Sequence, residues 1–218
     1  MQAAAVVVKN VFRRHRKQYI GLIILSAFLL LLSGGFSRYI KKVFGEIKLK
    51  TQMEEELQRK EVKALIEEFR CFPLRDTKEF YYENGYGTAR TYGGKRKHEG
   101  IDLIPKDGKE NVHPVVSASD GIVEQIGWLK LGGYRVGIRS ETGFYYYYAH
   151  LASYAKGLRK GKKIRSGELL GYMGSTGYGT EGTRGKFVCH LHFGIYRQVE
   201  EKEKSLNPYY LLRFKENG

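Results

Sequence analysis

The sequence predicts a mainly β protein, built on a twisted antiparallel sheet and preceded by two N-terminal helices. From residue 72 onward, short runs rich in tyrosine and β-branched residues alternate with glycine-containing turns, which is typical of antiparallel strands. Before them, residues 19–36 carry no charged side chain and residues 37–71 are dense in Lys, Glu, Gln and Leu. We therefore expect a basic tail over 1–18, an apolar helix over 19–36, a polar helix over 37–71 and a β domain over 72–214.

The apolar segment 19–36 has the sequence pattern of a membrane anchor. No acidic residue precedes Glu46, and five basic residues stand just before the segment: Lys9, Arg13, Arg14, Arg16 and Lys17. A spanning helix needs about 20 apolar residues, and the positive-inside rule keeps such a basic flank in the cytoplasm. We expect a single-pass anchor in the cytoplasmic membrane with the β domain outside it. Two alternatives are a signal peptide cleaved near Ser33-Gly34-Gly35, which would give a secreted protein, and a buried core helix.

The segment 37–71 is expected to form a juxtamembrane helix that lifts the β domain off the bilayer. It contains no proline and a single glycine, Gly45, and its apolar residues recur at rough helical spacing: Ile40, Phe44, Ile47, Leu57, Leu65 and Phe69. A short coiled coil is an alternative, but the heptad pattern breaks across residues 48–56. A solvated amphipathic stalk is the favoured interpretation.

The β domain begins after Cys71 and is expected to close with a turn and a short helical segment over residues 207–214. Its strand-forming runs include residues 115–128, 144–151 and 188–196, separated by Asp-Gly, Thr-Gly and Ser-Gly turns. Two cysteines exclude a disulfide scaffold and a CxxC zinc site. One disulfide between Cys71 and Cys189 is possible in an exported domain, but we expect two unpaired thiols.

Histidine is scarce but concentrated. Four of the six histidines fall in three short segments: HEGID at 98–102, YAHL at 148–151 and HLHF at 190–193. On an extended strand, His190 and His192 point to one face while Leu191 and Phe193 point to the other. One face can then bind a metal while the opposite face packs in the core. His15 belongs to the basic flank, and His113 is expected in a loop.

In HEGID, His98 and Asp102 are four residues apart, which is about 13 Å along a straight strand and too far for both to reach one ion. A bend at Gly100 would bring them together. Two histidines and one carboxylate around a tetrahedral ion leave the fourth position to water, as in hydrolytic zinc sites. Spacing alone does not tell whether His190 or His192 is the second histidine.

In the strand predicted over 144–151, alternation places His150 on the face of Phe144, Tyr146 and Tyr148. A second imidazole close to a metal-bound water can orient it, accept its proton or stabilise the developing oxyanion. His150 is therefore a candidate catalytic residue at the end of this strand.

Together, and in this order, the three segments resemble peptidase family M23, the lysostaphin/LytM-type zinc metalloendopeptidases of bacterial peptidoglycan. HEGID matches the family's HxGxD, YAHL its Y-x-H-L and HLHF its HxHF. The connecting residues are similar too, with small-D-G-x-V at 119–123, a glycine-rich segment at 161–167 and G-x-T-G at 174–177. The resemblance covers about residues 85–197.

The resemblance implies that His98, Asp102 and His192 bind Zn²⁺, while His150 and His190 flank the attacking water as base and transition-state stabiliser. It also implies a lysostaphin/LytM-like sheet of the duplicated-hybrid-motif type, with the metal on the floor of a narrow groove. The family's substrates are glycine-containing cross-bridges or stem-peptide bonds.

Two departures from the family pattern concern the groove wall. Residues 178–189 form a longer loop than is usual between GxTG and HxH, and Cys189 stands where proline is common. Cys189 as an extra or inhibitory metal ligand is one alternative, but a packed strand residue is favoured, because a free cysteine behaves as a small hydrophobe.

The sequence thus predicts a membrane-anchored zinc metalloendopeptidase that hydrolyses peptide bonds in cell-wall peptidoglycan, with a protein regulator left open. The alternative is a non-catalytic, membrane-tethered wall-binding or assembly scaffold of the same fold, but such members usually lose a ligand and all five site residues are present here. The net charge is +15, of which +8 lies before Glu46. The remaining +7 suits anionic wall polymers, and no nucleic-acid partner is expected.

Overall fold

The computed structural model describes residues 43–47, 51 and 59–216. The chain divides into two compact units, residues 1–60 and 61–218. In the first unit the described residues are helical. Across the described residues, no helix combines the length and the apolar character that crossing a bilayer requires. The tail and the anchor expected over 1–18 and 19–36 lie outside the described residues.

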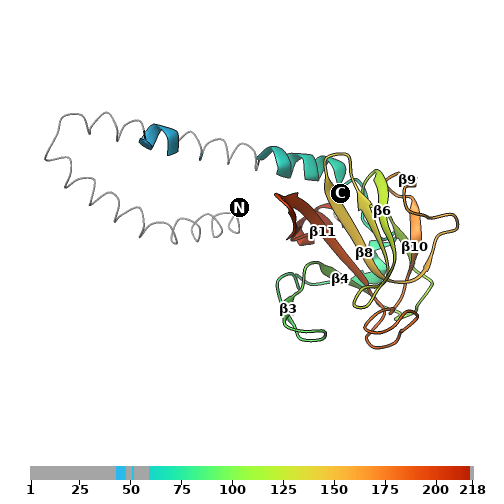
Figure 1. The fold of residues 1–218 in the computed structure, drawn as a ribbon. Coiled ribbons are helices and arrows are strands. Elements are labelled where there is room, and N and C mark those ends of the chain that lie inside the picture. Colours follow the sequence, from blue (N-terminus) through green and yellow to red (C-terminus); the bar gives the residue numbers. More distant parts are fainter. Residues whose placement is uncertain (1–42, 48–50, 52–58, 217–218) are drawn as a thin grey trace, which may run out of the picture. The chain divides into compact units, whose positions relative to one another are not determined.

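The second unit is dominated by antiparallel strands, which confirms the mainly β prediction (Figure 1). The main path of its sheet runs in the order β1 (Phe80–Tyr81), β4 (Ile101–Pro105), β11 (Leu191–Val199), β8 (Phe144–Tyr154), β7 (Gly133–Arg139), β6 (Gly121–Leu129) and β9 (Lys163–Ile164). Off this path, β10 (Leu169–Met173) pairs with β8 and with β5 (Pro114–Val116), and β12 (Lys202–Leu206) pairs with β11. A separate hairpin joins β2 (Ala89–Arg90) to β3 (Arg96–Lys97).

Two short helical elements accompany the strands, a 3₁₀ turn over Thr77–Glu79 and the helix α3 (Tyr209–Glu216). The helix α3 agrees with the helical segment expected near 207–214. The Asn207 side chain accepts a hydrogen bond from the Tyr209 backbone N–H at 3.0 Å, which satisfies a donor that the first helical turn leaves free. Leu212 is fully buried and fixes the helix on the domain.

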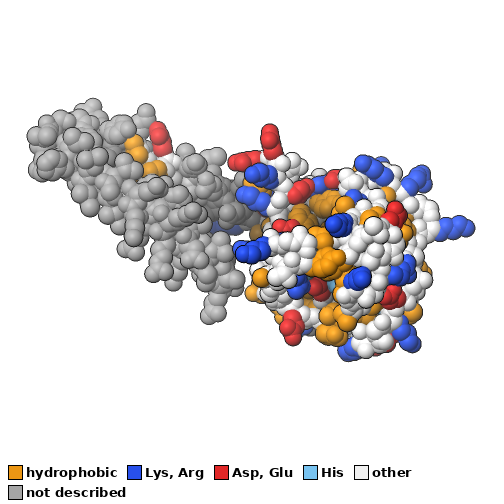
Figure 2. Space-filling view, turned by 60° about the horizontal axis from the view of Figure 1, so that its bottom comes forward, with side chains coloured by type: hydrophobic (Ala, Val, Ile, Leu, Met, Phe, Trp, Pro, Cys, Tyr) orange, Lys and Arg blue, Asp and Glu red, His pale blue; other side chains and the backbone are white. Residues whose placement is uncertain are grey.

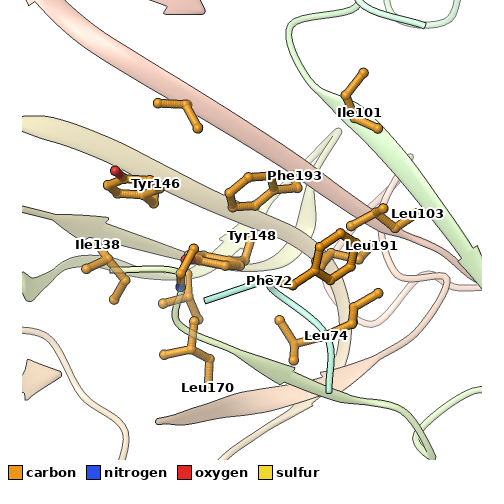
Figure 3. Close-up of a cluster of buried hydrophobic side chains, with 14 of the residues drawn as sticks. Phe72, Leu74, Ile101, Leu103, Ile138, Tyr146, Tyr148, Leu170, Leu191 and Phe193 are labelled. Atoms are coloured by element: carbon orange, nitrogen blue, oxygen red, sulfur yellow. The ribbon is translucent and has the colours of Figure 1, made fainter. Parts of the chain in front are cut away.

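One face of the central strands forms the core. Alternate residues of β4, β11 and β8 are fully buried and contact one another (Figure 3): Ile101, Leu103, Leu191, Phe193, Tyr146 and Tyr148. Because side chains alternate along a strand, Asp102, His192 and Tyr147 must lie on the opposite face. The polar residues of these three neighbouring strands therefore share the opposite face of the sheet.

The core extends into the segment expected as a stalk. Residues 61–68 are helical, and Leu65 and Phe69 belong to the core cluster. The Phe69 ring lies 6.4 Å from the Tyr146 ring and 6.0 Å from the Phe193 ring, and Glu68 accepts a hydrogen bond from the Tyr146 hydroxyl at 2.7 Å. The compact unit therefore begins at Glu61 rather than at 72. Amphipathic spacing fits a helix on a domain surface as well as a solvated stalk.

The expectation that His150 shares a face with Tyr146 and Tyr148 is wrong. Tyr134 of β7 pairs with Leu151, and Val136 pairs with Tyr148, so β8 has one residue more than β7 between these pairs. His150 adopts a positive φ of 65° in this bulge. The extra residue moves Leu151 into the core and turns His150 to the polar face.

Candidate functional site

The three predicted metal ligands lie together on the polar face. Asp102 of β4 is paired directly with His192 of β11, and His98 stands four residues before Asp102. Nε2 of His98, Oδ1 of Asp102 and Nδ1 of His192 form a triangle in which each pair of atoms is 3.0 Å apart. No other group of three His, Cys, Asp or Glu side chains within the described residues has the spacing of a metal site.

His98 reaches this triangle because the chain bends at Gly100. A Cβ atom at Gly100 would lie 2.4 Å from the Phe193 carbonyl oxygen and 2.8 Å from the His192 ring, so only glycine fits there. Nδ1 of His98 donates to the Gly85 carbonyl at 3.0 Å, which leaves the Nε2 lone pair for a metal.

The donor set fits zinc. Two imidazole nitrogens and one carboxylate oxygen are the protein ligands of many hydrolytic zinc sites, and three atoms 3.0 Å apart share a point roughly 2 Å from each, the usual Zn–N and Zn–O distance. The three side chains line one wall of a groove of about 750 Å³, so a fourth position would face the groove.

The second oxygen of the Asp102 carboxylate is held by an arginine that the sequence analysis missed. Arg90 of β2 donates from Nη2 to Oδ2 of Asp102 at 2.9 Å. Burial raises the pKa of Asp102, but the imidazoles of His192 and His98, whose nitrogens lie 3.0 Å from its Oδ1 atom, outweigh burial and hold this pKa well below the usual range. No motif marks Arg90, because only the placement of the hairpin β2–β3 beside β4 brings it to the site.

His150 and His190 lie side by side next to the triangle, with ring centroids 4.6 Å apart. Nδ1 of His150 donates to the Thr176 carbonyl and Nδ1 of His190 to the Val188 carbonyl, both at 2.8 Å. Each ring therefore presents an unprotonated Nε2, and Nε2 of His190 lies 3.7 Å from Oδ1 of Asp102. Burial lowers the pKa of both histidines, so both are neutral near pH 7.

The long loop 178–189 forms part of the groove wall. It contributes Tyr178 and Phe187, whose rings are 4.8 Å apart, and the Phe187 ring lies 4.6 Å from the His150 ring. Tyr178 also stacks on Tyr92 at 4.2 Å and thereby connects the loop to the turn between β2 and β3. Aromatic side chains of this loop thus pack against the two histidines.

The remaining candidates lie outside the groove. Cys189 packs in the core, and its thiol faces the Lys109 carbonyl at 3.4 Å, so the alternative of a metal-binding thiol is wrong. Both cysteines are unpaired, as expected. His113 is a loop residue whose Nε2 lies 2.7 Å from Oδ1 of Asp107.

Several known proteins are similar to this chain. An L-Ala--D-Glu endopeptidase of Bacillus subtilis is 43% identical over 143 residues, which are 66% of this chain and 43% of that protein. Lysostaphin of Staphylococcus simulans is 31% identical over 118 residues, 51% of this chain and 21% of that protein. The chain therefore spans less than half the length of these relatives.

Solved structures share the fold. A Ruminococcus gnavus structure described as a glycyl-glycine endopeptidase lytM has a TM-score of 0.69 and 40% sequence identity, with coverage of 85% of this chain and 73% of that one. The lysostaphin catalytic domain of Staphylococcus simulans has a TM-score of 0.50 and 26% identity, covering 63% and 95% of the two chains. Residues 96–208 match the family model "Peptidase family M23", and the chain belongs to that family.

Proposed function

We propose that this protein is a zinc-dependent endopeptidase that hydrolyses peptide bonds in bacterial peptidoglycan. The observation that carries the proposal is the triangle of ligand atoms from His98, Asp102 and His192, next to two neutral histidines in a groove. The name of the Bacillus subtilis relative favours stem-peptide bonds of the L-Ala–D-Glu type over other peptidoglycan bonds.

The hydrogen bonds indicate a role for each residue of the site. His98, Asp102 and His192 would hold the zinc, which when bound polarises a carbonyl and acidifies water. His150 and His190 are each fixed by a backbone carbonyl at Nδ1, so Nε2 is free to accept a proton from the attacking water. Once protonated, the same Nε2–H can donate to the oxyanion or to the leaving amine.

A membrane anchor over residues 19–36, with the peptidase domain outside the cytoplasmic membrane, completes the proposal. It is supported by the absence of charge in this segment and by the cluster of basic residues before it. Alkaline phosphatase fused after residue 218 should be active in cells, whereas a cytoplasmic domain would leave the fusion inactive.

A non-catalytic scaffold is the less favoured function. It needs neither a ligand triangle nor two histidines with fixed tautomers, and the chain has both. Removal of one zinc ligand would abolish the activity of a peptidase but leave a scaffold unaffected. His98 is therefore the residue to change.

The test uses the purified full-length chain, its zinc content by plasma mass spectrometry and the fragments it releases from purified peptidoglycan. The unchanged chain should hold one zinc and release peptides, and His98→Ala should lose both. His113→Ala is the matched control, because this imidazole lies outside the groove, and it should keep both properties. A His98→Ala variant that still releases peptides would overturn the proposal.

A further inference from the structure

Arg135 of β7 brings an unsatisfied positive group to the groove. Its side chain lines the groove, and its Nη1 atom is buried without a hydrogen-bond partner. Arg135 forms no ion pair anywhere in the described part of the chain. A buried guanidinium nitrogen without an acceptor is costly, and an anion bound in the groove would remove that cost.

The register of the sheet places Arg135 near the proposed metal centre. Val136 and Ile138 of β7 are in the core, so Arg135 projects from the opposite face, which carries His192. His192 pairs with Ala149 of β8, and Arg135 lies opposite the β8 bulge that contains Ala149 and His150. Two strand spacings are roughly 10 Å, and the long arginine side chain spans part of that distance. An anion at Arg135 would therefore belong to a substrate residue close to the bond that is cut.

The carboxylates that line the same groove do not neutralise Arg135. Asp102 is paired with Arg90 at 2.9 Å, and Glu203 is paired with Arg139 at 2.6 Å. The third, Glu99, is exposed and interacts with the Tyr196 hydroxyl.

Arg96 adds a second guanidinium to the groove. Its Nη2 donates to the Tyr178 hydroxyl at 3.0 Å, while its buried Nε has no partner. Lys and Arg side chains are also spread over the face of the domain shown in Figure 2. The groove thus offers two incompletely paired guanidiniums to an acidic ligand.

We propose that Arg135 forms a carboxylate-binding subsite, which makes the enzyme selective for peptides with a free carboxylate on a residue beside the cleaved bond. The inference rests on the proposed peptidase function and narrows its substrate class. A planar guanidinium matches a carboxylate through two parallel N–H···O bonds. Uncharged glycine cross-bridges offer no such partner and would be poor substrates.

The experiment compares two synthetic stem peptides that differ at one group. One carries the free α-carboxylate of D-Glu beside the cleaved bond, and the other carries the carboxamide there. The zinc-loaded full-length chain should cleave the acid about ten- to hundredfold better in kcat/KM, because the carboxylate accepts two charge-assisted hydrogen bonds while the neutral carboxamide offers the guanidinium one acceptor oxygen. Arg135→Gln should lose this preference and cleave the acid no better than the amide.

Two further variants separate the subsite from general effects. Arg135→Lys keeps the charge without the planar fork and should retain part of the preference for the acid. Lys97→Gln removes an exposed cation that lines the same groove and should change the preference less than twofold. Thermal unfolding of each variant shows that the fold is retained, which is expected because Arg135 lies on the face opposite the core.

The outcomes distinguish this inference from the proposed function. Equal cleavage of acid and amide by the unchanged chain, or an equal loss of both in Arg135→Gln, would overturn the subsite and leave the peptidase intact. If neither peptide is cleaved, the affinities of the same two peptides, measured by calorimetry, decide whether the subsite exists. If the acid binds more tightly than the amide and Arg135→Gln abolishes this difference, the subsite is supported although the peptidase function is not. Equal binding of the two peptides would contradict both the subsite and the peptidase function.

Discussion

At the scale of single residues, the site depends on hydrogen bonds that fix histidine tautomers. His98, His150 and His190 each donate from Nδ1 to a backbone carbonyl, of Gly85, Thr176 and Val188 respectively. The backbone therefore decides which ring nitrogen is free. His192 is different, because its Nδ1 atom is the one that joins the ligand triangle. The motif HxH thus combines two imidazoles that use different nitrogens, which its spacing does not reveal.

Arg90 orients a proposed metal ligand. It donates to the Asp102 oxygen that faces away from His98 and His192. Removing such an outer partner of a metal ligand typically lowers metal affinity by about 10- to 100-fold. Arg90→Ala should therefore weaken zinc binding to that extent, measured by competition with a chromophoric chelator. Arg90→Lys should lie between this variant and the unchanged chain, since a lysine keeps the charge but not the geometry.

The control is Lys97→Ala, which removes an exposed cation from the same hairpin. Its zinc affinity should match that of the unchanged chain. Equal zinc affinities of Arg90→Ala and Lys97→Ala would show that the Arg90 contact does not orient Asp102.

At the scale of elements, the bend before β4 decides whether His98 reaches the other ligands. Gly100→Ala places a methyl group 2.4 Å from the Phe193 carbonyl of β11, so one of the two strands must shift. We expect a loss of about 1–3 kcal/mol in the free energy of unfolding, together with weakened zinc binding. Urea titration and zinc competition measure the two effects.

Gly45→Ala is the matched control, since a Cβ there meets no atom within 4 Å. It should leave zinc affinity unchanged. Normal zinc binding by Gly100→Ala would mean that β4 and β11 tolerate a larger separation than the structure has.

The helix over residues 61–68 is held on the domain by the aromatic residue that follows it. The Phe69 side chain that follows it is fully buried against Tyr146 and Phe193. Phe69→Ala should lower the free energy of unfolding by about 3–5 kcal/mol, because a large aromatic ring leaves the core. Val62→Ala, at a position that is 57% exposed, should change it by less than about 1 kcal/mol. Similar values for the two variants would place this segment outside the cooperative unit.

At the scale of the whole molecule, buried tyrosines set the alkaline limit of stability. Burial raises the pKa of Tyr146 and of Tyr148 well above the ordinary value near 10. In the unfolded chain these phenols ionise near pH 10, so unfolding releases protons above that pH. The stability that the neutral phenols contribute is complete below pH 10 and should fall steadily above it.

Urea unfolding between pH 8 and 11 checks this expectation. The midpoint should fall most steeply above about pH 10, beyond a smaller decline from about pH 9 that comes from the buried Cys189 thiol, whose pKa is also raised. The variant Tyr148→Phe should show a shallower decline. A midpoint independent of pH across this range would contradict the burial of these hydroxyls.

Much of the molecule follows from its sequence, for identifiable reasons. Turn residues between β-branched runs predicted the antiparallel sheet, and strand alternation placed Leu191 and Phe193 in the core. The structure brings the three predicted ligands together, and their binding of zinc stays a prediction. Alternation failed at His150, because a bulge depends on pairing with β7, which local sequence does not show.

The groove residues that lie outside the motifs also depend on strand pairing and could not be predicted from local sequence. Arg90 and Arg135 come from strands that carry no motif, and only the order of strands in the sheet brings them to the site. The core role of Leu65 and Phe69 was hidden because their helical spacing is equally typical of a solvated stalk.

The proposed activity requires that His98, Asp102 and His192 bind one zinc ion. Anomalous diffraction from zinc-loaded crystals of the full-length chain, recorded on both sides of the zinc absorption edge, tests it most directly. We expect a single peak in the groove, roughly 2 Å from Nε2 of His98, Oδ1 of Asp102 and Nδ1 of His192. A groove without a peak, or a zinc ion held by other side chains, would contradict it.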